Sequence, residues 1–188
     1  MKKYLIFSIL ISILNSCATF SRKMIKDDLS VITKENVSVI DGEYDFKGYE
    51  HINSAGKISE QTRDFAGMMD LTNTKIADYD KVVIKSKALD KKKKYKLEFK
   101  LLKNDSVKYS FTYNGTLKNG LFMLSNYTSK CHGIPFLLGG CRSFQSRIGL
   151  TGQKDLLIQD YYDNSGAALF IMWAGYTINY AEKFKRIQ

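Results

Sequence analysis

Histidine and proline are scarce in this chain, and the motifs of common enzyme classes are missing from it. There are two histidines, His51 and His132, and one proline among 188 residues. The sequence contains no G-x-S-x-G elbow, no phosphate-binding P-loop, no H-E-x-x-H pair and no EF-hand loop. Folding can still assemble a Ser/His/Asp triad from distant residues, but no motif points to one. We therefore expect a protein that is not an enzyme and needs no metal or cofactor.

The N-terminus carries the clearest signal. Lys2 and Lys3 precede an apolar run over residues 4–14, which is shorter than the roughly 20 residues that span a bilayer. The run ends in Leu14-Asn15-Ser16-Cys17. This layout resembles the signal peptide and lipobox of bacterial lipoproteins, which implies cleavage before Cys17 and lipidation of that cysteine. An ordinary secretory signal cut nearby and an uncleaved anchor helix are the alternatives.

The lipoprotein resemblance also implies a location and a first partner. Two or more acyl chains make a stable membrane anchor, so the partner would be the membrane itself. Ala18 follows Cys17, and by analogy with lipoprotein sorting in enteric bacteria this favours the outer membrane. The formal net charge is +10, but nucleic acid is not an expected partner in a bacterial envelope. Anionic lipid, envelope polysaccharide or an envelope protein would be the partners at hand.

Two further cysteines, Cys131 and Cys141, are left once Cys17 is assigned to lipid. An even pair in an oxidising compartment predicts a disulfide. The Gly-flanked segment 132–140 between them can turn back on itself. A metal site at Cys131 and His132 is the alternative, although no further cluster of ligands supports it.

Alternation of apolar and polar residues dominates the rest of the chain. In residues 95–101 every odd position is apolar and every even position charged, and residues 107–113 repeat the pattern, which is typical of half-buried strands. Asn104-Asp105 joins these two strands as a tight turn, and Asn119-Gly120 ends the next connection. Further strands are expected over 43–49, 82–89, 121–127, 144–150, 156–161 and 168–180, with a weaker one over 57–63 and a short helix or loop over 64–71. Turns are expected at 151–154 and 163–166.

Short connections between eight or nine strands predict an antiparallel up-and-down meander that closes into a barrel or a strongly curved sheet. The layout is similar to lipocalin-type β-barrels, including Gly42-x-Tyr44 at the first strand, although lipocalins usually carry Trp at this kind of position. We expect three segments: a signal peptide over 1–16, a lipidated tether with a short helix over 17–36, and one β-rich domain over 37–188.

Two kinds of functional residue follow from this fold. If the barrel is hollow, it would bind an apolar or amphipathic ligand, which is the leading hypothesis; the expected lining residues are Phe99, Tyr109, Phe111 and Phe144, with Phe136 in a loop near the mouth. If the core is filled, the protein would be a structural or interaction module of the envelope. Residues 168–174 are apolar on both faces, so Leu169, Ile171 and Trp173 would then meet either another part of the chain or a protein partner.

Overall fold

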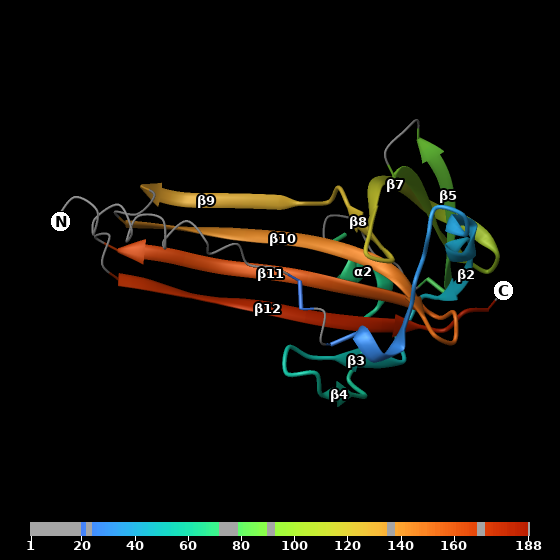
Figure 1. Ribbon diagram of the computed structural model, residues 1–188, viewed down its shortest axis with the longest axis horizontal. Coiled ribbons are helices and arrows are strands. Elements are labelled where there is room, and N and C mark those ends of the chain that lie inside the picture. Colours follow the sequence, from blue (N-terminus) through green and yellow to red (C-terminus); the bar gives the residue numbers. More distant parts are fainter. Residues whose placement is uncertain are drawn as a thin grey trace.

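The computed structural model describes residues 20–21, 24–71, 79–89, 93–134, 138–168 and 172–187. Within these residues the fold is one antiparallel sheet of twelve strands (Figure 1). The strand order is β2-β5-β6-β7-β8-β10-β11-β12-β3-β4, and β1 and β9 each pair with β10 off this path. The predicted class, a mainly β up-and-down meander, is confirmed. The sheet is strongly curved, and it is not closed into a barrel.

The sheet divides into a packed head and a long arm. The strands that lie wholly in the head are β2 (Gly42–Asp45), β5 (Lys81–Leu89), β6 (Lys94–Lys103), β7 (Ser106–Lys118) and β8 (Leu121–Leu124). Four longer or outlying strands follow, namely β9 (Thr128–Ile134), β10 (Leu138–Thr151), β11 (Leu156–Ala168) and β12 (Met172–Phe184). We define the arm as β9 together with residues 138–144, 162–168 and 172–178 of β10, β11 and β12, which run side by side away from the head.

Short elements surround the base of the head. The small strands are β1 (Leu29–Ser30), β3 (Glu50–Ile52) and β4 (Ile58–Ser59). The helical turns are η1 (Lys26–Asp28), η2 (Val37–Ile40) and α2 (Phe65–Met68). The helix α2 confirms one of the two structures expected for 64–71. It begins at Asp64, whose carboxylate accepts a hydrogen bond from the Gly67 N–H at 2.7 Å, as an N-cap residue does.

The two predicted hairpin turns form as the sequence indicates. Asn104 and Asp105 have φ values of 48° and 57°, and Asn119 and Gly120 have 55° and 82°. Two successive residues with positive φ are the requirement of a tight hairpin turn whose twist matches the strands, and Asn, Asp and Gly tolerate that backbone best. These turns set the β6–β7 and β7–β8 ladders in register.

Aromatic side chains fill the inner face of the curved sheet. Phe65 of α2 packs there, with its ring centroid 5.8 Å from that of Phe99 and 5.9 Å from that of Phe184. All three are fully buried. A smaller apolar cluster on the other face of the sheet joins Ile25, Ile52 and Leu157. The head therefore has apolar packing on both faces at its base.

The edge strand β2 meets the residues that follow β12 without forming a regular ladder. Tyr44 of β2 makes an isolated antiparallel bridge with Arg186, which follows β12. Hydrogen bonds flank the bridge, from the Asp45 N–H to the Lys185 carbonyl at 2.8 Å and from the Ile187 N–H to the Glu43 carbonyl at 2.8 Å. These contacts join β2 to the residues after β12 at one point of the curved sheet.

One prediction of local structure is wrong. Residues 163–166 form no turn but lie inside β11, because ladders to β10 and β12 hold them extended. The Asp163 carboxylate, which would suit a turn, instead accepts a hydrogen bond from the Thr177 hydroxyl at 2.8 Å. In the described part of 17–36 the helical segment is the 3-10 turn η1, and Leu29 and Ser30 pair with β10 immediately after it.

Candidate functional site

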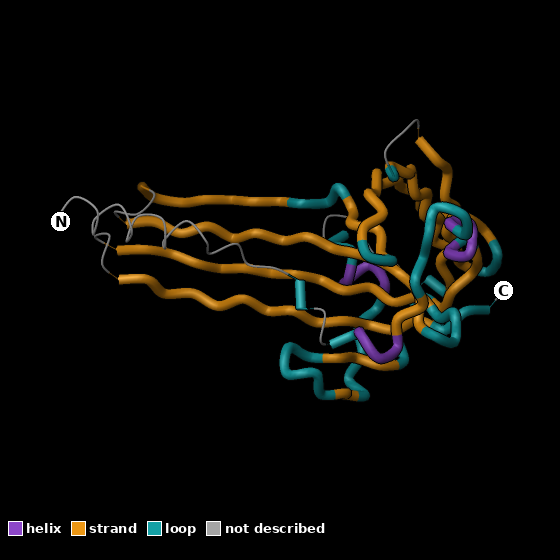
Figure 2. The backbone as a smooth tube through the Cα atoms, in the orientation of Figure 1, coloured by secondary structure: helices purple, strands orange, loops and turns teal. Residues whose placement is uncertain are grey.

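The arm is a single layer of sheet that is open to solvent on both faces. Figure 2 shows its four strands running beyond the head with no helix or other strand stacked on them. Apart from Phe144 at the base of the arm, none of the described arm side chains is buried. A sheet this long normally buries at least one face against a second layer. Its exposure makes the arm the first candidate for a contact surface.

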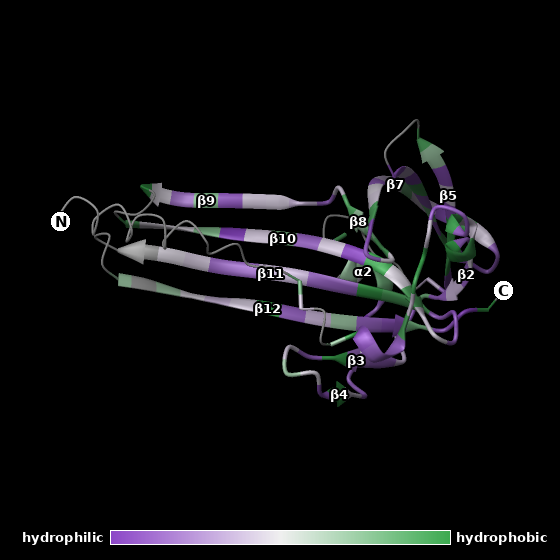
Figure 3. Ribbon diagram, in the orientation of Figure 1, coloured by the Kyte–Doolittle hydropathy of each residue, from purple (hydrophilic) through white to green (hydrophobic). Residues whose placement is uncertain are grey.

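An apolar row ends the arm. Ile134 lies opposite Leu138, and Leu138 is in register with Ala168 and through it with Met172, so these side chains share one face. The side chains of Ile134, Leu138 and Met172 are 62%, 64% and 67% exposed. Figure 3 shows hydrophobic colour at the outer ends of β9 and β12 and more polar colour along the middle of the arm. Large apolar side chains that are this exposed and adjacent mark contact sites.

A basic pair lies behind that row on the same face. Lys130 of β9 is directly opposite Arg142 of β10, and both are exposed. Lys130 is four residues from Ile134 along β9, and side chains an even number of residues apart point to the same side of a strand. Tyr176 is in register with Lys130 and Arg142 across the sheet, and its side chain is 51% exposed.

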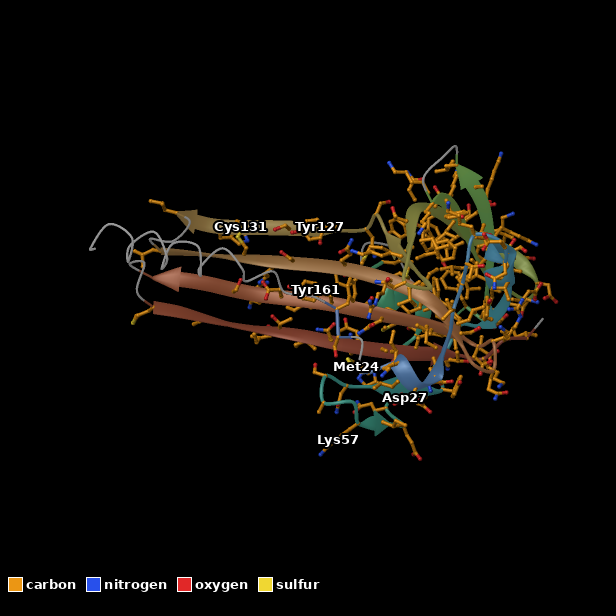
Figure 4. All side chains as sticks on the ribbon, in the orientation of Figure 1. Met24, Asp27, Lys57, Tyr127, Cys131 and Tyr161 are labelled. Carbon is orange, nitrogen blue, oxygen red and sulfur yellow. A yellow bond between two sulfur atoms is a disulfide. The ribbon has the colours of Figure 1, made fainter. Side chains whose placement is uncertain are left out.

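The predicted disulfide between Cys131 and Cys141 is confirmed. The two residues lie opposite each other on β9 and β10, on the face away from Lys130 and Arg142. Figure 4 shows Cys131 on β9. The bridge joins the outlying strand β9 to the arm near its outer end. It also uses the thiol of Cys131, which the alternative metal site would need. Among the described residues, no three His, Cys, Asp or Glu side chains are grouped to hold a metal ion.

Residues 20–21 are pinned at the base of the arm. The Ser21 N–H donates to Asn179 Oδ1 at 2.9 Å, and Gln159 donates its side-chain N–H to the Ser21 carbonyl at 2.8 Å. The ring of Phe20 lies 5.7 Å from that of Tyr161, and the Arg147 guanidinium sits 4.6 Å above the Phe20 ring. These contacts place Phe20 on the face that carries the disulfide.

A buried polar cluster lies at the same base, on the opposite face. Glu182 is fully buried, with Oε2 at 2.8 Å from His51 Nδ1 and Oε1 accepting from the Arg63 N–H at 3.1 Å. Burial raises the pKa of Glu182, and the hydrogen bond to His51 offsets part of that rise. The Arg63 guanidinium stacks 4.5 Å above the Tyr180 ring.

Asp160, next to this cluster, is fully buried and lacks a hydrogen-bond partner for either carboxylate oxygen among the described residues. Burial raises the pKa of Asp160 well above its usual value. The hydroxyls of Ser146 and Tyr180 are near enough to offset part of that rise, but neither reaches hydrogen-bond geometry. The carboxyl group is therefore held in its neutral form more readily than an exposed aspartate.

The five residues expected to line a ligand cavity do not come together as one lining. Phe99 and Phe111 stack with ring centroids 5.0 Å apart, and Tyr109 lies 5.7 Å from Phe111. These three fill space against one another and against the core. Phe144 is buried separately on β10, and Phe136 lies outside the described residues.

Two cavities lie at the margins of the head. One of about 370 Å³ is lined by residues that include Leu89, Gly115, Met123 and Leu124. The other, of about 170 Å³, is lined by residues that include Met24, Asp28 and Lys183. None of the four predicted lining residues that the structure describes, Phe99, Tyr109, Phe111 and Phe144, is among the residues that line either cavity.

The three residues expected to form a partner surface fall at the outer end of the arm or beyond what is described. Trp173 lies in β12, with its backbone opposite Ala167 of β11. Leu169 and Ile171 lie outside the described residues. The exposed row of Ile134, Leu138 and Met172 was not predicted from the sequence. The apolar residues at positions 134 and 138, equally spaced in the sequence about Phe136, were the available signal.

No protein-family model, curated protein or solved structure matches this chain. Its fold and site define a mainly β protein with a packed head and a disulfide-linked, single-layer arm. None of the helices in the described residues has the length and apolar character needed to cross a membrane.

Proposed function

We propose that this chain is a non-catalytic, lipid-anchored protein of the bacterial cell envelope that acts as an interaction module. The head is a filled support, and the arm is the surface that makes contact. The lipobox-like run Leu14–Cys17 supports the anchor, and Ala18 favours the outer membrane.

The observation that carries the proposal is the arm itself. Its exposed sheet costs conformational entropy to order and gains little burial in return. The chain nevertheless adds a disulfide between β9 and β10 at this position. A stabilised element without a core of its own is best explained by a contact made elsewhere.

Two measurements test the proposal. The full chain is expressed in a bacterial host with an alkyne-tagged palmitate, and Cys17→Ser is the matched control. We expect label on the wild-type chain and none on the variant. A wild-type chain without label contradicts the anchor.

For the contact surface, a photo-crosslinking amino acid is placed at Tyr176 of the arm or at Val107 of the head. The two positions are matched in exposure, at 51% and 53%. Adducts from position 176 that position 107 does not give are expected. Equal adducts from both positions contradict a role specific to the arm.

Ligand binding is the second candidate, and the cavity of about 370 Å³ supports it. This volume lies within the range of small-molecule sites. Native mass spectrometry of the full chain should then show an added mass that is lost on unfolding. Met123→Trp would fill the cavity and abolish that mass, whereas Val107→Trp, on an exposed strand, would keep it.

A further inference from the structure

We propose that the outer end of the arm inserts into the interfacial layer of the anionic membrane that carries the lipid anchor, with Lys130 and Arg142 at the level of the lipid headgroups. The proposal rests on the lipidation of Cys17 put forward above. It names the occupant of the exposed arm as a lipid surface and not a protein.

The first argument is the length of the tether. Cys17 is three residues before Phe20, so the two Cα atoms are at most about 11 Å apart. Phe20 is fixed beside Tyr161, and Tyr161 is three residues from Asn164, which pairs with Arg142. Three strand residues span about 10 Å. A lipid on Cys17 can therefore reach the level of the basic pair, so the tether allows the membrane to lie at this level of the arm.

The second argument is the sign of the charge. No Asp or Glu occurs between Asp105 and Asp155, or between Asp163 and Glu182. All of β9 and the outer parts of the other arm strands beyond Asp163 therefore carry no negative charge. Lys130 and Arg142 supply positive charge at the level that the tether indicates. Basic residues at this position would be attracted to anionic headgroups.

The third argument is the distance from the basic pair to the apolar row. Ile134 is four residues beyond Lys130, or about 13 Å along the strand. Apolar groups of interfacial proteins enter roughly 5–10 Å into the boundary between headgroups and acyl chains. With the basic pair among the outer phosphates, the exposed side chains of Ile134, Leu138 and Met172 would reach this boundary.

The open edges of the arm set the limit of insertion. In the described residues β9 pairs only with β10, and the outer edge of β12 pairs only with β3 at positions 181–183. Unpaired backbone groups are not tolerated in lipid hydrocarbon. The arm must therefore stop in the hydrated interface, and it does not span the bilayer.

The single tryptophan of the chain, Trp173, provides the reporter, since it follows Met172 in β12. The lipidated full chain is reconstituted into phosphatidylcholine vesicles with and without phosphatidylglycerol. We expect Trp173 emission to shift to the blue and to be quenched by brominated lipid. Quenching by iodide should be at least about twofold weaker than in soluble Cys17→Ser protein. Inclusion of phosphatidylglycerol should strengthen each effect.

Matched charge reversals test the arrangement of the arm. Lys130→Glu with Arg142→Glu should remove the dependence on phosphatidylglycerol. Lys108→Glu with Lys118→Glu changes the net charge equally on exposed positions of β7 in the head and should keep that dependence. Replacing Ile134, Leu138 and Met172 by Ser should abolish quenching by brominated lipid.

The outcomes separate this inference from the proposed function. A chain that floats with the vesicles while Trp173 stays as accessible to iodide as in the soluble variant overturns membrane insertion, and it leaves the arm open to a protein partner. A chain that carries no lipid overturns the anchor instead. An equal loss of the lipid dependence in both charge-reversal variants overturns the assigned level of Lys130 and Arg142.

Discussion

Asp155, just before β11, and Arg186, just after β12, are joined by a hydrogen bond of 3.0 Å from the Arg186 N–H to the Asp155 carboxylate. The same carboxylate accepts from the Tyr49 hydroxyl at 2.9 Å and from Lys185 Nζ at 3.1 Å. Arg186 in turn donates to the carbonyls of Val39 and Asp41 at 2.9 Å and 2.6 Å. This pair therefore joins the residues that follow β12 to the start of β11 and to the residues just before β2.

Asp155→Asn should destabilise the protein at neutral pH by about 1–3 kcal/mol, the usual worth of hydrogen bonds to a charged group. Desolvation raises the pKa of Asp155, but the hydrogen bonds from Arg186, Lys185 and Tyr49 together lower it by more. The pKa of Asp155 therefore lies below its ordinary value. A group with a lowered pKa stabilises the folded state at pH values above its ordinary pKa. This stabilisation is lost as the pH falls through the folded-state pKa. Urea unfolding of both proteins at several pH values should show the difference shrinking in acid. A constant difference would contradict this role.

Asp160→Asn should change the free energy of unfolding in the opposite direction. Burial raises the pKa of Asp160. The contribution of its neutral form to the stability of the protein is therefore complete at pH values below the ordinary pKa. It is lost as the pH rises through the folded-state pKa. Removing this buried, unpartnered charge should stabilise the protein at neutral pH by about 1–3 kcal/mol and change little in strong acid. The same urea series measures it. A variant that is less stable than wild type at neutral pH would show that the charge has a partner.

Loss of the disulfide should loosen the arm and spare the head. The bridge closes a loop with a sequence separation of 10, for which chain entropy gives about 2–3 kcal/mol. In Cys131→Ser with Cys141→Ser, amide exchange should accelerate in β9 and in the outer half of β10. Protection in β5 and β6 should stay at its wild-type level, because their ladders do not contact the arm. Faster exchange in β5 and β6 as well would mean that arm and head unfold together.

The aromatic core offers a test of whether the head is filled. Phe99→Ala removes a fully buried ring and should cost about 3–5 kcal/mol of unfolding free energy. Val107→Ala, at a position that is 53% exposed, should change stability by less than about 0.5 kcal/mol. Chemical denaturation measures both. A small effect of Phe99→Ala would indicate a hollow interior, as the ligand hypothesis requires.

Much of the head was predictable because its signals are local. The alternation in 95–101 and the Asn104-Asp105 turn each depend on neighbouring residues, and both match β6 and the β6–β7 hairpin. In these regions sequence pattern and final structure agree because burial follows the pattern directly. In the arm, only the pair Cys131 and Cys141 was predictable in advance, from the even number of remaining cysteines and the expected oxidising compartment.

The arm and its base were not predictable in the same way. The strand β9 has a fully exposed, largely polar sequence, and only pairing with β10 makes it a strand. Residues 163–166 have turn chemistry that two neighbouring ladders override. The hydrogen bond between His51 and Glu182 joins residues 131 positions apart. Such contacts arise from the tertiary fold, and no local pattern announces them.

The single bridge between Tyr44 and Arg186 has a consequence for folding kinetics. These residues are 142 positions apart. The strand β3 likewise pairs with residues 181–183 of β12, which are synthesised much later. During synthesis β2 and β3 therefore emerge early, with backbone groups that stay unpaired until residues 181–187 have been made. Non-local pairings of this kind form slowly, and open strand edges invite aggregation while they persist. A nascent chain that stalls before residue 181 would hold both edges open and depend on a chaperone for its solubility.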